Sequence, residues 1–284
     1  MAALTGVSRR GVRTSIAEGG VWLNGRTCRV ASRLLQLGDV IDVIPPPGSD
    51  PAAPPAIPAL SILYEDGWLV AVDKPRGAHT QPPRERTPGQ LAVHELAILR
   101  LSLREGRRAE LKLLHRLDRI TSGVLLFARN HGAARGLARV WAAGEAVKRY
   151  LAVVRGAVPE HLEIAEPIGP DASTPGRFRV QRGGRPARTL VRRLAAAAGL
   201  ALIEARPLSG RTHQVRVHLA AHGHPVVGDS LYGGGVAPPG PFLHAWRLEL
   251  PHPRDGRRLV IEAPLPGDLR TFLDAHRLAP APDH

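Results

Sequence analysis

Residues 45–58 constrain the fold most, because their sequence, PPPGSDPAAPPAIP, holds seven prolines and no aromatic residue. Proline fixes φ and lacks a backbone donor, so such a segment forms an extended spacer and cannot build a core. We therefore predict a small module at residues 1–44, a linker at 45–60 and a large domain at 61–284. Of these parts, only the large domain is long enough to bury a substantial core by itself.

The composition is that of a globular protein, with 43% hydrophobic and 23% charged residues in 284. No apolar run approaches the roughly 18 residues of a membrane span, and the N-terminus lacks the apolar core of a secretory signal. The single cysteine, Cys28, excludes an intramolecular disulfide framework and a cysteine-rich zinc site. We expect a protein of the reducing cytoplasm that does not enter a membrane.

The net charge of +14, from 39 basic and 25 acidic residues, favours a polyanionic partner. Nucleic acid is preferred over a membrane surface, because neutralising phosphates releases condensed counterions. The alternative explanation is a GC-rich genome, since all the cations except Lys74, Lys112 and Lys148 are arginines.

In the small module, Ser8 is a suitable N-cap for a short basic helix that ends at Gly19 and Gly20. A hairpin follows, because apolar residues flank Asn24-Gly25, the strongest two-residue turn signal. A further strand is predicted at residues 40–44. This is too little core for independent stability, so we interpret the piece as a docking module.

The large domain has the pattern of an α+β fold with many antiparallel strands. Asp66-Gly67 marks a hairpin, and Thr87 followed by Pro88 is typical of a helix start. The predicted helices cover residues 87–103, 131–142 and 212–222. The predicted strands cover residues 62–64, 68–72, 111–117, 123–128, 149–154, 188–194 and 200–206.

The polar sequence from His115 to Gly123, HRLDRITSG, lies between two mostly apolar stretches. A polar loop between buried strands is a common place for functional side chains. The alternative is a capped turn in which Asp118 accepts backbone N–H groups and Gly123 supplies an unusual φ.

Four histidines follow in twelve residues, at His213, His218, His222 and His224, which raises the hypothesis of a metal-dependent hydrolase. The chain lacks the His-Glu-x-x-His pattern that such an enzyme would use. We therefore favour histidines that form hydrogen bonds at an interface and expect no metal.

Two further patterns have both a functional and a structural interpretation. Strand alternation places Lys148, Tyr150 and Ala152 on one face, where a single tyrosine is either a site residue or part of the core. The segment 176–193 holds seven arginines and no acidic residue, which indicates either a solvated face or a surface that contacts phosphates.

Taken together, these segments resemble the RluA-type RNA pseudouridine synthases over residues 61–265. The small module resembles the S4-like RNA-binding domain first known from a ribosomal small-subunit protein, with a shortened first helix expected. The resemblance implies a central, mostly antiparallel mixed sheet with flanking helices and a catalytic cleft. The motifs that carry it, in order, are DKP (73–75), HRLDRITSGVLLFA (115–128), KRYLAVVRG (148–156), GRPART (184–189), GRTHQVRVHLAAHGHPVVGDSLYGG (210–234) and LHAWRLELPHP (243–253).

The resemblance implies the isomerisation of uridine in RNA to pseudouridine, in which the N1–C1′ bond breaks and C5 becomes bonded to the sugar. Asp118 matches the catalytic aspartate, either as a nucleophile at C1′ or as the support of an elimination route. Arg211 matches the arginine that pairs with it, and Tyr150 matches the aromatic residue on which the uracil stacks. Arg116 is the candidate to fill the space left by the extruded base.

The resemblance implies no cofactor and no metal, and RNA as the partner of what we expect to be a monomer. Ribosomal RNA is favoured over transfer RNA. An inactive RNA-binding assembly factor is the alternative function. Besides Arg116, the residues expected to contact RNA are His115, Arg119, Thr121, Arg185, His213, Gln214 and Arg216 in the large domain and Arg9, Arg10 and Arg13 in the small module.

Overall fold

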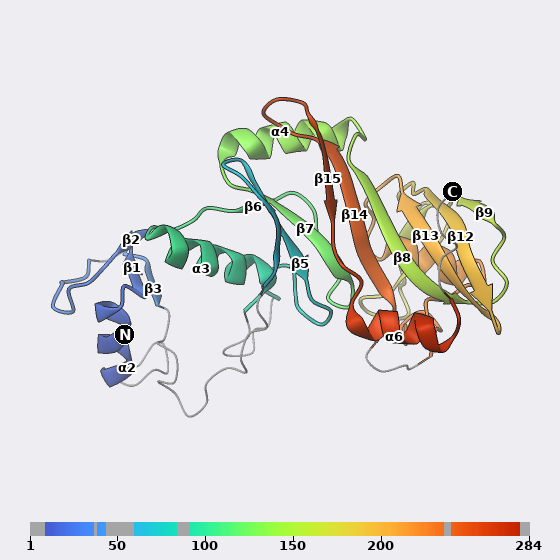
Figure 1. The fold of residues 1–284 in the computed structure, drawn as a ribbon, viewed down its shortest axis with the longest axis horizontal. Helices are drawn as coiled ribbons and strands as arrows, with labels where there is room; N and C mark the ends of the chain where they lie inside the picture. Colours follow the sequence, from blue (N-terminus) through green and yellow to red (C-terminus); the bar gives the residue numbers. More distant parts are fainter. Residues whose placement is uncertain (1–8, 37–38, 44–59, 84–90, 236–239, 279–284) are drawn as a thin grey trace. The chain divides into compact units, whose positions relative to one another are not determined.

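The computed structural model describes residues 9–36, 39–43, 60–83, 91–235 and 240–278, which form two compact units (Figure 1). The first unit joins the residues up to Leu60 with His79–Lys112, and the second joins Ser61–Ala78 with the residues from Leu113 onward. The segment His79–Lys112, which the sequence placed in the large domain, is thus part of the first unit. The predicted linker lies almost wholly outside the described residues.

The first unit contains a helix and a small antiparallel sheet of strand order β2-β1-β3. Asn24 and Gly25 have φ values of 51° and 79°, which confirms the predicted two-residue hairpin turn. Val12 and Ile16 of the helix pack on Val21 of the sheet. The elements are α2 (Arg9–Ala17), β1 (Val21–Leu23), β2 (Arg26–Thr27) and β3 (Ile41–Val43).

Helix α3 (Val93–Glu105) belongs to the same unit. Its first turn is closed by the Glu95 carboxylate, which accepts a hydrogen bond from the Ala92 N–H at 3.0 Å. Beyond its end, Arg108 forms an ion pair with Asp42 of β3 at 2.9 Å. The predicted helix start at Thr87 lies outside the described residues.

The second unit is built on a large mixed sheet in the order β4-β5-β7-β14-β8-β13-β12-β9, with β15 on β14. Strands β7 and β14 pair in parallel, whereas their neighbours β5, β8 and β15 pair with them antiparallel. This confirms the predicted α+β class. The strands are β4 (Ile62–Glu65), β5 (Leu69–Lys74), β7 (Ser122–Ala128), β8 (Val147–Arg155), β9 (His161–Ile164), β12 (Thr189–Ala197), β13 (Leu200–Pro207), β14 (Leu243–Pro251) and β15 (Arg258–Glu262).

Helices cover both faces of this sheet, because strand alternation gives each face its own apolar set. On β8, Ala152 and Val154 pack with Val215 and Leu219 of α5 (Gln214–Ala221). Val153 faces the other way and packs with α6 (Gly267–Ala275). A third helix, α4 (His131–Ala142), packs through Leu137 on β5, β7 and β14. The face that carries α5 is also the face that carries the candidate site.

Gly123 permits the close approach of β7 to β14 in the parallel pair. Its φ is +112°, and a Cβ at this position would lie 2.2 Å from the Ala245 carbonyl oxygen. No side chain fits there, so the motif that contains Asp118 ends in a glycine for a steric reason.

Several elements of the second unit were not predicted from the sequence, and one predicted strand is longer than the observed one. The strand predicted at 111–117 is only the short β6 (Lys112–Leu113), where the chain passes from the first unit to the second, and a polar loop follows it. The elements that were not predicted are β9, β14, β15, α6 and the two-stranded sheet of β10 (Ile168–Pro170) and β11 (Phe178–Val180).

Candidate active site

The loop before β7 carries Asp118 and is fixed at both ends. His115 accepts a hydrogen bond from the Leu126 N–H through Nε2 at 2.9 Å, and its ring stacks on Trp141. At the other end, the Thr121 N–H donates to the Asp118 carbonyl at 3.1 Å. These contacts confirm the predicted polar loop between apolar stretches and give it a defined conformation.

Lys74 of β5 adds a third anchor from inside the protein. Its side chain is fully buried, and Nζ lies 3.2 Å from the Arg119 carbonyl oxygen and 2.7 Å from that of Ala78. Burial lowers the pKa of this amine to about 7, against the opposing attraction of Asp118. A buried lysine therefore holds the backbone next to Asp118.

Asp118 lies on the wall of a cavity of about 570 Å³. Lys148 and Tyr150 of β8 also line this cavity, as their predicted common face requires. The rest of the wall comes from residues 114–117, Thr121, Trp141 of α4, Gly144, Ala146, Val147, residues 206–216 and Leu243. The cavity thus gathers residues of four of the sequence motifs, although more than a hundred residues separate the first of them from the last.

The ion-pair partner of Asp118 is Arg216, not Arg211. Arg216 Nη1 lies 3.2 Å from Asp118 Oδ2, whereas Arg211 Nε donates to the Pro186 carbonyl at 2.9 Å. The pairing expected for Arg211 is therefore corrected. The physical reason is that α5 begins at Gln214, so Arg216 lies in its first turn beside Asp118 while Arg211 precedes the helix. Arg211 still lines the cavity.

Arg216 is held by more than Asp118. Its Nε and Nη2 lie 2.7 and 2.9 Å from the two carboxylate oxygens of Asp229, and its guanidinium lies 4.8 Å from the centre of the Tyr232 ring. Burial lowers the pKa of Arg216, but the hydrogen bonds and charges of Asp229 and Asp118 outweigh it and raise the pKa overall. Arg216 therefore stays charged although it is buried.

His213 is the second group near Asp118. Its Nε2 lies 3.9 Å from Asp118 Oδ1, and its Nδ1 lies 2.8 Å from the Tyr232 hydroxyl. Burial lowers the pKa of this histidine more than Asp118 raises it, so the ring is neutral at pH 7.

Tyr150 presents a half-buried ring to the cavity. Burial, with the charge of Asp118 added, raises the pKa of its hydroxyl above the usual value, so the side chain is a neutral phenol at pH 7. Beside it on β8, Lys148 donates to the Ser209 carbonyl at 3.1 Å, and burial lowers the pKa of that amine.

Three residues that were expected to contact RNA have internal partners in the structure. Gln214 accepts from Ser209 and Arg211 and donates to Arg188 and Thr189, so its amide joins the loop before α5 to β12. Thr121 is 2% exposed, and His115 accepts a hydrogen bond from the Leu126 N–H of β7.

Four arginines that were expected to contact RNA are exposed in the structure. Arg116 and Arg119 are exposed on the loop that carries Asp118, and Arg185 is exposed on the arginine-rich segment. Arg13 is exposed on α2, while the side chains of Arg9 and Arg10 lie outside the described part of the chain.

The four histidines of the metal hypothesis each bond to other protein groups. His218 bonds to Thr189 and to the Glu166 carbonyl, and His222 bonds to the Glu166 carboxylate at 2.8 Å. In the described ranges, no three His, Cys, Asp or Glu side chains are grouped so that they could hold a metal ion. Across those same ranges, no helix has the length and apolar character to cross a membrane.

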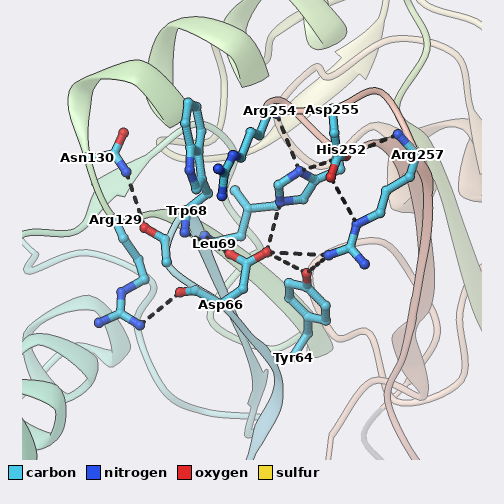
Figure 2. A network of polar contacts seen from close by, with 11 residues as sticks. Tyr64, Asp66, Trp68, Leu69, Arg129, Asn130, His252, Arg254, Asp255 and Arg257 are labelled. Atoms are coloured by element: carbon cyan, nitrogen blue, oxygen red, sulfur yellow. Dashed lines mark hydrogen bonds and ion pairs between the residues drawn. The ribbon is translucent and has the colours of Figure 1, made fainter.

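A second polar cluster lies at the turns β4–β5 and β14–β15 (Figure 2). The Asp66 carboxylate accepts from the Tyr64 hydroxyl at 2.6 Å and from the Trp68 and Leu69 N–H groups, and it pairs with His252 at 2.9 Å. None of the residues labelled in Figure 2 lines the cavity that holds Asp118. The cluster joins two turns and lies outside the candidate site.

Two family models match this chain. The family described as RNA pseudouridylate synthase matches residues 68–221, which include Asp118, Tyr150 and Arg216, and the S4 domain matches residues 1–41. The chain belongs to the RNA pseudouridylate synthase family. This pseudouridine synthase is accordingly an isomerase that acts on RNA, as the motifs predicted.

Relatives of this pseudouridine synthase match most of its length. It is 37% identical over 235 residues to ribosomal large subunit pseudouridine synthase D of Nitrosomonas europaea, covering 79% of this chain and 67% of that protein. It is 39% identical over 274 residues to an uncharacterized RNA pseudouridine synthase of Chloroflexus aurantiacus, covering 95% and 86%. The solved structure of human RNA pseudouridylate synthase domain containing 4 superposes with a TM-score of 0.65 at 26% identity, covering 77% of this chain and 94% of that one.

Sequence reasoning missed three residues of the pseudouridine synthase site: Lys74, Asp229 and Tyr232. Each had a signal. Lys74 ends the apolar strand LVAVDK, where a charged residue is unusual, and the other two lie in the predicted motif GDSLYGG. What the sequence did not show is that these residues contact Arg216, His213 and the Asp118 loop.

Proposed function

We propose that this chain converts uridine to pseudouridine in structured ribosomal RNA, with Asp118 as the catalytic group. The observation that carries the proposal is the position of the Asp118 carboxylate on the wall of the cavity, beside Tyr150 and held by the buried Arg216. A carboxylate at this position can attack C1′ or support elimination through the sugar. In either route the N1–C1′ bond breaks, C5 bonds to C1′, and the C5 proton passes to water.

Tyr150 is proposed to hold the uracil while it is detached from the sugar. Stacking on an aromatic ring is worth about 1–3 kcal/mol per base and does not depend on base identity. The raised pKa of Tyr150 keeps its hydroxyl protonated, so the ring adds no negative charge beside Asp118. Since a stacked base cannot react at C1′ and C5, the target must be extruded, and the exposed Arg116 is proposed to fill its place.

Ribosomal RNA is proposed as the substrate class for two reasons. The chain carries an S4 domain, and the relative from Nitrosomonas europaea is a ribosomal large subunit pseudouridine synthase. A monomer is proposed as the acting unit. The single cysteine supports the reducing cytoplasm as its location.

The test uses RNA that carries tritium at C5 of uridine, supplied as separate ribosomal and transfer RNA pools. Wild type is expected to release tritium to water from the ribosomal pool, and Asp118→Asn is expected to release none while its RNA affinity stays within about twofold. Asp255→Asn is the matched control, because its side chain is half exposed within the cluster of Figure 2.

Each contrary result has a defined meaning. Activity of Asp118→Asn near the wild-type rate would remove Asp118 from the catalytic role. Tight binding of RNA by wild type without release from either pool would favour the assembly-factor alternative. Release from the transfer RNA pool alone would contradict the proposed substrate class.

A further inference from the structure

The orientation of Arg216 is set by Asp229, which bonds to the side of the guanidinium away from Asp118. A guanidinium is planar, and two parallel bonds from Nε and Nη2 to one carboxylate fix both its plane and its rotation. Asp229 makes these two bonds at 2.7 and 2.9 Å. The remaining nitrogen, Nη1, is thereby directed to Asp118 Oδ2 at 3.2 Å. Asp229 and Asp118 therefore occupy two edges of the same guanidinium.

Asp229 also changes the charge that Asp118 experiences. Arg216 and Asp229 are 4% and 1% exposed, so water does little to screen their interaction. One cation shared between two carboxylates leaves a net negative charge in the group. Arg216 therefore holds Asp118 in place but neutralises its negative charge only in part. A group that must donate electrons needs this remaining charge.

The orientation of His213 is set by Tyr232, which bonds to the ring nitrogen that does not face Asp118. The Tyr232 hydroxyl accepts a hydrogen bond from the Phe178 N–H at 3.0 Å, so its own proton is available for His213 Nδ1 at 2.8 Å. Because this histidine is neutral at pH 7, its single proton then lies on Nε2. Nε2 is the atom 3.9 Å from Asp118 Oδ1, so an N–H group faces the carboxylate.

A single tight turn supplies both groups. Asp229 N–H donates to the Val226 carbonyl at 3.0 Å, and Gly234 N–H donates to the Asp229 carbonyl at 2.8 Å. A Cβ at Gly234 would lie 1.8 Å from the Val226 oxygen, so the turn closes only with glycine there. Asp229 and Tyr232 are thus fixed relative to each other by the backbone.

We propose that Asp229 and Tyr232 are positioning residues for Asp118, the first acting through Arg216 and the second through the proton of His213. This assignment rests on the proposed catalytic role of Asp118. It gives the turn at residues 228–234 a role in the chemical step rather than in RNA contact, and it extends the site beyond the residues that reach substrate.

The experiment measures the single-turnover rate of tritium release and, separately, the Kd for the same RNA. Asp229→Asn keeps the shape of the side chain and removes its charge, and Tyr232→Phe removes only the hydroxyl while keeping the ring beneath Arg216. Both are expected to lower the single-turnover rate by about tenfold or more, with the Kd within about twofold, because misplaced catalytic groups affect the rate rather than binding.

Matched controls come from the cluster of Figure 2. Tyr64→Phe removes a hydroxyl that bonds to Asp66 and Arg257, and Asp66→Asn changes a carboxylate with five partners. Both lie outside the cavity, so they are expected to lower the melting temperature and leave the single-turnover rate at the wild-type value. This comparison separates positioning from a general loss of stability.

Double variants give the deciding result. If Asp229 acts through Arg216, Asp229→Asn lowers the rate little further once Arg216→Gln is present, and Tyr232→Phe behaves likewise with His213→Gln. Folded single variants that react at the wild-type rate, or effects that multiply in full in the double variants, would overturn the inference. If Asp229→Asn fails to fold, Tyr232→Phe decides alone. A wild type that releases no tritium refutes the proposed function instead.

Discussion

Lys74 is a fully buried amine whose Nζ lies between three carbonyl oxygens, at 2.7 to 3.2 Å. Its pKa of about 7 in the folded protein lies well below the value of 10.5 for an ordinary lysine. Between these two pH values the unfolded chain binds a proton that the folded chain has released. Stability from this group is therefore greatest above pH 10.5 and is lost as the pH falls through about 7.

We expect this linkage to appear when wild type is compared with Lys74→Met. From pH 7 to pH 9, the free energy of unfolding of wild type should rise relative to the variant by roughly 2 kcal/mol, as integration over the shifted titration gives. Urea unfolding at several pH values measures it. A difference that stays constant with pH would contradict the lowered pKa.

At the level of single residues, the sequence predicted Asp118 and Tyr150 but not the arginine that pairs with Asp118. Sequence motifs identified Asp118 and Tyr150, and the structure places both in one cavity. The partner of Asp118 depended on where α5 begins, and that is set by the Gln214 amide and by the φ of 55° at His213. Neither is visible in a motif, so the motif alone does not distinguish Arg211 from Arg216 as the partner of Asp118.

A pair of conservative variants tests this correction. Arg216→Lys should lower the single-turnover rate by about a hundredfold, because an ammonium cannot bond to Asp229 in two places and reach Asp118 as well. Arg211→Lys should stay within about fivefold of wild type, since its observed bond is to a backbone carbonyl. The opposite order of the two rates would restore Arg211 as the partner.

At the scale of elements, the parallel contact between β7 and β14 depends on Gly123. Gly123→Ala should cost at least about 3 kcal/mol of stability, since the new methyl group would meet the Ala245 carbonyl and φ is +112°. Gly67→Ala is the matched control, because nothing lies within 4 Å of a Cβ there and its φ is not positive. Thermal unfolding of both variants measures the difference, and equal melting temperatures would refute the steric argument.

Prediction of the elements succeeded where local signals were strong. Asn24-Gly25 and Asp66-Gly67 each mark a hairpin turn that the structure contains. Prediction failed for elements that depend on contacts between residues far apart in the sequence or that lack a strong local signal. Strand β11 lies among arginines and is stabilised by pairing with β10, and α6 follows Pro266 with Gly267 in its first turn, a weak start for a helix.

At the scale of the whole molecule, the net charge of +14 should make RNA binding steeply dependent on salt. If at least six phosphates are neutralised, raising salt from 50 to 200 mM should weaken the Kd by about a thousandfold. Fluorescence anisotropy with labelled ribosomal RNA measures this. A change of less than about tenfold would argue against a mainly electrostatic interface.

Each arginine that contacts a phosphate should contribute separately to the dependence of log Kd on log salt concentration. Arg185→Gln, on the exposed arginine-rich segment, should reduce the slope of log Kd against log salt by about one. Arg257→Gln, which removes an exposed arginine of the Figure 2 cluster, should leave the slope unchanged.

The order of strands in the large sheet has a consequence during synthesis on the ribosome. Strands β4 and β5 are complete once residue 74 has emerged, yet β5 pairs with β7, which ends at residue 128, and β7 in turn pairs with β14, which ends at residue 251. At roughly 5–20 residues per second, the growing sheet lacks β14 for on the order of ten to thirty seconds after β5 appears. During that interval an apolar strand edge is open to other nascent chains, so this protein should depend on chaperones that bind at the tunnel exit.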